Sequence, residues 1–415
     1  MAVNQYKKTI VLVISTISLG LIVGLSSMLL GLFLDLVERV FLKYEETAKI
    51  PAPLGTFPTD RLLSVVVGAL IVAVIWWFLR TQTKTPISIK KALNGEQMPF
   101  WQTILHVMTQ IFFVGTGGSV GRELAPREAG ALFAQKWDNL LQKLHIPALS
   151  QSDRQLLMTA AAGAGFAGIY IAPFTGMLFS VEVLLKKLTL RTVAVSLTMS
   201  TIAMFVGSLA KGFRPYYLIG DAKFSAISFL LIFILAPIAG VVGALFRKLC
   251  QWAESHQTTN KLILWQLPAM GLITGLIALL LPEIMGNGRS LAQLAMSSSN
   301  QKMVGILLVG GLLKTFVTVL TIRAGAAGGT LTPAIAIGAV IGAIVGLFLM
   351  PWLPAVSIWQ CAVIGAGALL AASQQAPFMA MLMLIEICHL DSSALLPMGM
   401  AILIATGVSK KMLVK

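Results

Sequence analysis

Charged side chains are scarce in this chain of 415 residues. Only 11% of its residues are Asp, Glu, Lys or Arg, whereas 57% are hydrophobic and the mean hydropathy is +0.86. An ordinary soluble domain has about 25% charged residues, so this composition excludes that class. We therefore predict an all-α polytopic membrane protein, because apolar runs of about 20 residues match the length of a transmembrane helix.

Acidic residues are the scarcest charges: there are 16 of them against 31 Lys and Arg, which gives a net charge of +15. This excess does not predict a nucleic-acid partner, because the basic residues stand singly or in pairs between apolar runs. They are typical of cytoplasmic loop ends under the positive-inside rule. The pairs are Lys7 with Lys8, Lys90 with Lys91, Lys186 with Lys187, Arg247 with Lys248, and Lys410 with Lys411.

Cysteine and histidine are also rare. The chain has three cysteines, Cys250, Cys361 and Cys388, and four histidines. The cysteines are far apart and lie inside or beside apolar runs, so neither a disulfide framework nor a metal site is expected. We expect no metal and no other cofactor.

Long apolar runs recur along the chain. Several are shorter than a full span or contain Gly and Pro, so we expect tilted, broken and re-entrant helices beside complete ones. The first run has no small-residue cleavage site after it and predicts a retained helix, not a signal peptide. The small residues of 160–168 predict close helix packing. The apolar runs cover residues 10–34, 62–79, 229–246, 262–281, 303–322, 335–350, 361–372 and 395–408.

A glycine-rich segment interrupts the apolar pattern after residues 111–114. It reads Gly115-Thr-Gly-Gly-Ser-Val-Gly-Arg-Glu-Leu-Ala-Pro126. Non-helical backbone at membrane depth occurs only where it is buried in protein or lines a cavity. A helix that restarts at Arg122 and Glu123 would direct free N–H groups and the positive end of its dipole into that cavity, which suits an anion. Glu123 would then compete with a dissolved anion for the same donors.

Two pairs of similar segments indicate that the chain is duplicated. Residues 172–183 match residues 376–387 at six of twelve positions, and the two segments are 204 positions apart. Gly328-Gly-Thr-Leu-Thr-Pro333 likewise resembles residues 117–126 in placing a glycine-rich break before a proline. Paired interruptions of this kind predict a binding site at the repeat interface, near the membrane midplane. The sequence alone leaves open whether the repeats are parallel or inverted. The predicted membrane repeats are residues 1–215 and 216–415.

These motifs resemble those of a known family. Gly121-Arg-Glu-Leu-Ala-Pro126 resembles the Gly-Arg-Glu-Gly-Pro signature of the CLC family of chloride channels and proton-coupled chloride transporters. Gly325-Ala-Ala-Gly-Gly-Thr-Leu-Thr-Pro333 looks like the glycine motif of that family's second half. Both Ala-Pro-Phe segments look like its paired Ala-Pro helices, and Gly286-Asn-Gly288 also fits. The matches cover most of the chain, in family order and at family spacing.

The resemblance implies an all-α fold of two inverted-topology repeats, a homodimer with an anion pore within each subunit, and a place in the plasma membrane of a prokaryote. Glu123 would be the gating glutamate and the proton-transfer residue: ionised, it occupies an anion site, and protonated, it swings away. The anion would bind to backbone amides. These amides belong to Gly121, Arg122, Glu123, Leu124, Thr330 and Leu331.

Several positions depart from the family pattern. The serine-containing selectivity loop of the family aligns with Thr83-Lys-Thr-Pro86 only through its proline, so Thr83 is a weak substitute as hydroxyl donor. Thr330 and Leu331 stand where the family usually has other residues, and they are assigned by backbone position alone. No tyrosine follows the last apolar run to close the inner side of the anion site.

Proton coupling is a further point on which the chain departs from the family. Where proton-coupled members often carry a second glutamate, this chain has Val183, which cannot carry a proton. We therefore expect channel-like or weakly proton-coupled chloride transport, with a proton-coupled chloride antiporter as an alternative. The adjacent Glu182 corresponds to Glu386 in the other repeat, and this symmetry favours a structural role at helix ends.

Other charged residues near the breaks have two interpretations each. Glu128 is expected to form a salt bridge with a basic neighbour rather than a second proton site, because it lies about 140° around a helix from Glu123. Lys314 and Arg323 flank the second break. Buried cations there would attract anions, or they would pair with a carboxylate or a headgroup.

Two rival functions are compatible with the same residues. Gly117-Gly-Ser-Val-Gly121 fits the pattern of a serine nucleophile, so an intramembrane serine hydrolase with Ser119 as nucleophile and His106 as base is a remote alternative. A fluoride exporter on the same fold is the other, motivated by the weakened serine loop. The sequence favours a protein that is not an enzyme and that transports small inorganic anions, chloride first, across a lipid bilayer.

Overall fold

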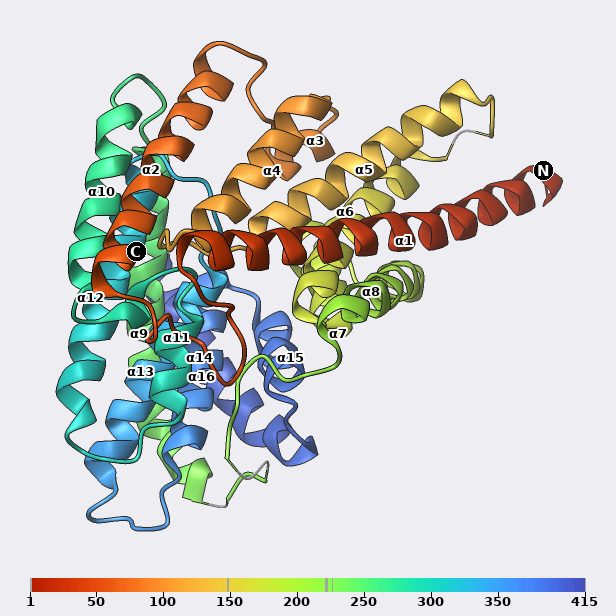
Figure 1. Cartoon of the computed structure of the whole chain (residues 1–415). Coiled ribbons are helices and arrows are strands. Elements are labelled where there is room, and N and C mark those ends of the chain that lie inside the picture. Colours follow the sequence, from red (N-terminus) through yellow and green to blue (C-terminus); the bar gives the residue numbers. More distant parts are fainter. Residues whose placement is uncertain (1, 148, 221–222, 226, 415) are drawn as a thin grey trace. The chain divides into compact units, whose positions relative to one another are not determined.

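The computed structural model describes residues 2–147, 149–220, 223–225 and 227–414 (Figure 1). Within these residues the chain is helical, and its one β-type pairing is an isolated bridge between Gly121 and Gly329. Seven of the described helices are long and apolar enough to cross a membrane. The predicted all-α, multi-pass architecture is therefore confirmed.

The helices follow the apolar runs of the sequence. A π-helical turn, Phe179–Leu184, extends the helix before it, and short 3-10 turns precede two others. In chain order the helices are α1 (Ala2–Phe41), α2 (Pro58–Thr81), α3 (Ile89–Leu93), α4 (Phe100–Gly115), α5 (Leu124–Lys143), α6 (Gln151–Tyr170), α7 (Pro173–Leu178), α8 (Leu190–Lys211), α9 (Ile227–Ser255), α10 (Ile263–Ala278), α11 (Arg289–Met296), α12 (Met303–Arg323), α13 (Leu331–Leu349), α14 (Ile358–Gln374), α15 (Pro377–Cys388) and α16 (Leu395–Leu413).

The chain forms two compact units, of which the first contains residues 2–33, 79–109 and 123–214. In this unit α6 packs against both α5 and α8. It does so through its small residues, as the sequence predicts. A Cβ atom added at Gly165 would lie 2.1 Å from the carbonyl oxygen of Pro126, so only glycine lets these two backbones approach so closely.

The second unit contains residues 34–78 and 110–122 together with the described residues from 215 onward. Its helices α9 to α16 run from green to blue in Figure 1. α13 packs closely against α14: a Cβ atom added at Gly342 would lie 2.0 Å from the carbonyl oxygen of Cys361. α14 also packs against α9 and α16, and it is buried along nearly its whole length.

The duplication is visible in the local backbone of each unit. α6 is capped by Ile171 and α14 by Gln375, and both residues have left-handed backbone, with φ of +56° and +57°. The next residues, Ala172 and Ala376, also share their conformation, with φ of −131° and −133°. Each leads into a helix that begins with proline. The boundary between the predicted repeats at residue 215 stays a prediction.

Candidate functional site

The first glycine-rich segment breaks the helical backbone as predicted. α4 ends at Gly115, and α5 begins at Leu124. Gly117 has φ of +103°, a conformation that favours glycine. Its carbonyl oxygen accepts a hydrogen bond from the N–H of Gly286 at 2.9 Å. This bond ties the break to the Gly-Asn-Gly loop that precedes α11.

The second break, between α12 and α13, is joined to the first. The N–H of Gly121 donates to the carbonyl oxygen of Gly329 at 2.7 Å, and the N–H of Gly329 donates back at 2.8 Å. Thr330 and Leu331 follow directly, at the start of α13. The pairing therefore brings Gly121 and its neighbour Arg122 beside the first turn of α13, so that these predicted anion-binding residues gather in the second unit.

Glu123 and Leu124 belong to the first unit, where they begin α5. Glu123 is fully buried and is the residue before the first helical turn. Arg127 Nε donates a hydrogen bond to the carbonyl oxygen of Glu123 at 2.7 Å, and its guanidinium lies 4.7 Å from the centre of the Phe179 ring. Sequence reasoning missed this role of Arg127. The only signal was its spacing from Glu123, which puts both on one side of a helix.

Thr83 follows α2 in the same unit. Its hydroxyl donates a hydrogen bond to the carbonyl oxygen of Leu79 at 2.9 Å, which satisfies an open carbonyl at the end of the helix. The predicted donation to an anion requires this bond to break, and it stays a prediction.

A buried lysine supports the first break. Lys314 on α12 is fully buried, and its Nζ donates three hydrogen bonds. The acceptors are Oγ of Ser119 at 2.9 Å and the carbonyl oxygens of Ile284 at 2.9 Å and Gly286 at 2.7 Å. Three donors thus meet three neutral oxygens, which suits an ammonium group. The three contacts are to neutral oxygens and not to a carboxylate or a headgroup, and the attraction of anions by Lys314 stays a prediction.

A cluster of charges surrounds Arg122 in the second unit. Oε1 of Glu46 lies 3.4 Å from Nη1 of Arg122 and 2.8 Å from Nη1 of Arg289. The ring of Tyr216 lies against both guanidinium groups, with its centre 5.3 Å from Arg122 and 3.9 Å from Arg289. Burial raises the pKa of Tyr216, so its phenol stays protonated. Sequence reasoning singled out Arg122 but none of its three neighbours.

The other charged residues singled out in the sequence have separate surroundings. Oε2 of Glu128 lies 3.6 Å from Nε2 of His106. Because a histidine is charged only when protonated, this contact does not establish the salt bridge expected for Glu128, which stays a prediction. The guanidinium of Arg323 lies 5.6 Å from the centre of the Trp252 ring, within the range of a cation–π contact. The three cysteines are buried free thiols.

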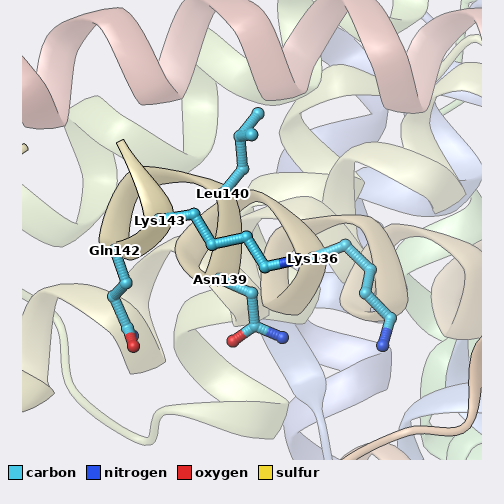
Figure 2. Close-up of a pocket in the computed structure, with 5 residues that line it drawn as sticks. All are labelled: Lys136, Asn139, Leu140, Gln142 and Lys143. Carbon is cyan, nitrogen blue, oxygen red and sulfur yellow. The ribbon is translucent and has the colours of Figure 1, made fainter. Parts of the chain in front are cut away.

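A hollow on the surface of the first unit lies at the far end of α5 from Glu123 (Figure 2). Residues of this helix alone line it, and no second element closes it. It is therefore no part of the candidate site. The lining residues are Lys136, Asn139, Leu140, Gln142 and Lys143.

Residues 67–410 match the protein family described as voltage gated chloride channel. The chain belongs to this family. The voltage-gated ClC-type chloride channel ClcB of Salmonella typhimurium is 27% identical over 391 residues, which cover 90% of each chain. The protein of the same name from Escherichia coli is 28% identical over 368 residues, which cover 85% of this chain and 84% of the relative.

Solved structures share the fold. A slow cyanobacterial Cl⁻/H⁺ antiporter superimposes with a TM-score of 0.80 at 21% identity, over 97% of this chain and 94% of that one. A CLC-type fluoride/proton antiporter gives 0.68 at 19% identity, over 97% and 96%. The predicted CLC-like fold is thus confirmed, and the chain is a multi-pass membrane protein of a family that transports anions.

Proposed function

We propose that the chain transports chloride and that Glu123 is its gate. The observation that carries the proposal is the place of Glu123: it is fully buried and stands at the N-terminus of α5, directly after a glycine-rich break. The N–H groups of a first helical turn bind anions. A carboxylate tethered at that point competes with chloride for them, and its removal opens the path.

Backbone amides are the proposed ligands of the anion. In the second unit, the Gly121 bridge places such amides beside the first turn of α13. In the first unit, the first turn of α5 offers more of them, with the Thr83 hydroxyl as an additional donor. Amides suit this task because they stabilise an anion without trapping it as a fixed full charge would. The proposed amide donors are Gly121, Arg122, Glu123, Leu124, Thr330 and Leu331.

We propose channel-like or weakly coupled transport because of Val183. This valine lies in the π-helical turn Phe179–Leu184, at the position where proton-coupled transport would need an internal proton acceptor. Glu182 beside it corresponds to Glu386 in the other repeat, and we propose that both glutamates have a structural role at helix ends.

Ser119 is proposed to be structural, not a nucleophile. Its hydroxyl oxygen accepts a hydrogen bond from Lys314 and lies 3.1 Å from the hydroxyl of Thr318. Lys314 also donates to two backbone carbonyl groups, so its contacts hold the Ser119 hydroxyl within the break. The contacts therefore favour the transporter over the serine hydrolase.

Chloride efflux from proteoliposomes tests the proposed function. Purified protein is reconstituted with internal chloride, and efflux is followed with and without valinomycin while proton movement is recorded. The comparison is between the wild-type chain, Glu123→Gln, and the matched control Glu96→Gln, which removes an exposed carboxylate from the same unit. We expect chloride efflux by the wild-type chain to need valinomycin and to carry no protons. The rate of efflux should differ from the wild-type rate in Glu123→Gln and should equal it in Glu96→Gln.

Other outcomes redirect the proposal. Uphill proton movement driven by chloride would overturn the channel-like assignment in favour of a proton-coupled antiporter. Fluoride efflux without chloride efflux would favour the export alternative. Equal behaviour of Glu123→Gln and the wild-type chain would remove Glu123 from the role of gate.

We also propose a homodimer, because the family resemblance implies one. Mass measurement of the detergent-purified protein tests this, and a particle that contains one 44.3 kDa chain would contradict it.

A further inference from the structure

Glu46 holds two arginines at the end of the first break. Its Oε1 atom lies 2.8 Å from Nη1 of Arg289 and 3.4 Å from Nη1 of Arg122. The side chains of Glu46, Arg289 and Arg122 are only 9%, 7% and 4% exposed. Charges so well shielded from water interact strongly, so these arginines require an anionic partner.

Arg289 has hydrogen bonds besides its contact with Glu46. Nε and Nη2 of Arg289 donate hydrogen bonds to the carbonyl oxygen of Tyr216 at 3.0 and 2.6 Å. The N–H of Arg289 donates to Oδ1 of Asn287 at 3.0 Å, and Nδ2 of Asn287 donates to the Tyr216 hydroxyl at 2.9 Å. These neutral contacts would hold the guanidinium group in place if the carboxylate left.

Glu46, by contrast, lies in a loop. It belongs to residues 42–57, between α1 and α2, a segment without regular helix. Its backbone N–H donates to Oε2 of Glu38 at 2.9 Å, so this second carboxylate anchors the loop while the Glu46 side chain reaches the arginines. Loop residues move more readily than the elements that they join.

The space beside Glu46 is small, and polar and apolar residues both line it. Glu38, Tyr44 and Glu46 line a cavity of about 10 Å³, enough for roughly one water molecule. Burial and the carboxylates of Glu38 and Glu46 raise the pKa of Tyr44 well above its usual value, so its hydroxyl stays protonated there. The Glu46 carboxylate thus occupies the place beside the two guanidinium groups that an anion would take.

We propose that Arg122 and Arg289 form a second anion-binding site, for a small monovalent anion such as a halide, which the Glu46 carboxylate fills as a tethered substitute. The inference rests on the proposed function, because Arg122 directly precedes the gate Glu123 in the chain. If Lys7 and Lys8 mark the cytoplasmic end of α1, the loop that carries Glu46 lies on the outer face. The site then collects anions on that face, in competition with Glu46.

Bromide binding to the detergent-purified full-length chain tests this site. Bromide is titrated calorimetrically in gluconate buffer into the wild-type chain, Glu46→Gln and Glu45→Gln. Glu45 is the matched control, because it carries the same charge on the same loop but pairs with Arg39 at the exposed surface. We expect Glu46→Gln to bind one more bromide per chain than the wild-type chain binds. If the wild-type chain also binds bromide at Arg122 and Arg289, its affinity there should be at least about tenfold lower.

A double variant locates the additional ion. In the double variant Glu46→Gln with Arg289→Gln, the additional bromide is expected to disappear. If Glu46→Gln and the wild-type chain bind the same number of bromide ions per chain, the inference is overturned. The same gain in Glu45→Gln would also overturn it, because the effect would then be one of net charge alone.

Stability gives a second measurement if Glu46→Gln folds poorly. Glu46→Ala leaves room for the ion, and its folded yield is compared between bromide and gluconate. A yield that depends on bromide supports the site, and equal yields refute it. If the wild-type chain transports chloride but Glu46→Gln binds no additional bromide, this inference is overturned and the proposed function stands. If Glu46→Gln binds the additional bromide but the wild-type chain transports no chloride, the proposed function is overturned and the anion site stands.

Discussion

Gly121 and Gly329 exchange both of their backbone hydrogen bonds, at 2.7 and 2.8 Å. They come from the two glycine-rich breaks, so these breaks form one paired structure in the second unit. The pairing fixes the path of the backbone just before Arg122 on one side and just before the first turn of α13 on the other. Changes at this pair are therefore expected to act on anion transport.

Gly328→Ala tests the pairing. A Cβ atom at Gly328 would lie 2.5 Å from Cγ2 of Val120 and 3.2 Å from the carbonyl oxygen of Gly121. Val120 is fully buried and cannot move aside, so we expect a loss of about 1–3 kcal/mol of stability, as for other overpacked cores, and at least about a tenfold fall in chloride efflux. Gly305→Ala is the control, because nothing lies within 4 Å of a Cβ atom there. Normal efflux in Gly328→Ala would contradict the importance of the bridge.

Lys314→Met tests the buried cation. The substitution keeps the approximate length of the side chain but leaves the carbonyl oxygens of Ile284 and Gly286 without their donor. Each buried group left without a partner costs about 1–3 kcal/mol, so we expect a loss of roughly 3 kcal/mol, visible as a lower melting temperature, together with weaker chloride binding. Lys302→Met, at the exposed N-terminal end of the same helix, should leave both unchanged. Chloride binding that persists unaltered in Lys314→Met would show that the lysine is purely structural.

Arg127→Gln tests the support of the gate. Arg127 donates a hydrogen bond to the backbone of Glu123 and stacks on Phe179. Loss of this charge-assisted bond costs about 1.5–3 kcal/mol, so we expect the start of α5 to loosen and chloride efflux to fall by about tenfold. The control is Arg191→Gln, which removes an arginine that is 57% exposed. The effect of Arg127→Gln should be small in a Glu123→Gln background, and additive effects would argue against a shared role.

Two substitutions at Tyr216 separate the contributions of its ring and of its hydroxyl group to the stability of the protein. Tyr216→Phe removes the acceptor of the Asn287 hydrogen bond and is expected to cost about 1 kcal/mol of stability. Tyr216→Leu also removes the ring on which Arg122 and Arg289 lie, and it should cost about 1–2 kcal/mol more. Thermal unfolding in detergent measures both. Equal losses in the two variants would show that the ring contributes nothing beyond its bulk.

The fold and the two breaks in its helices were predictable because they depend on local patterns. Apolar runs set the helices, and glycine-rich interruptions mark where the backbone leaves them. The internal match at an offset of 204 positions is accompanied by an agreement of the backbones at Ala172 and Ala376. The place of the proposed gate was predictable for the same reason, since Glu123 follows a glycine break within a few residues.

The partners of the charged residues were not predictable, because they are set by tertiary packing. Glu46 and Arg289 are 243 positions apart, and Ser119 and Lys314 are 195 apart. No periodicity links such pairs. Each residue alone is compatible with a headgroup contact, a loop position or a buried pair, and only the folded chain selects one. For Arg127 the sequence showed its spacing from Glu123. It did not show the hydrogen bond, because the acceptor is the backbone carbonyl oxygen of Glu123.

The left-handed turns at Ile171 and Gln375 bear on what the two similar segments share. Left-handed backbone costs a residue other than glycine about 1–2 kcal/mol, and a β-branched isoleucine is an especially poor choice for it. The two side chains have no chemistry in common, yet both stand in the same conformation before an Ala-Pro pair. The two segments thus share the course of the main chain and not the side chains, so a substitution at either turn can change the side chain freely as long as it accepts a left-handed backbone.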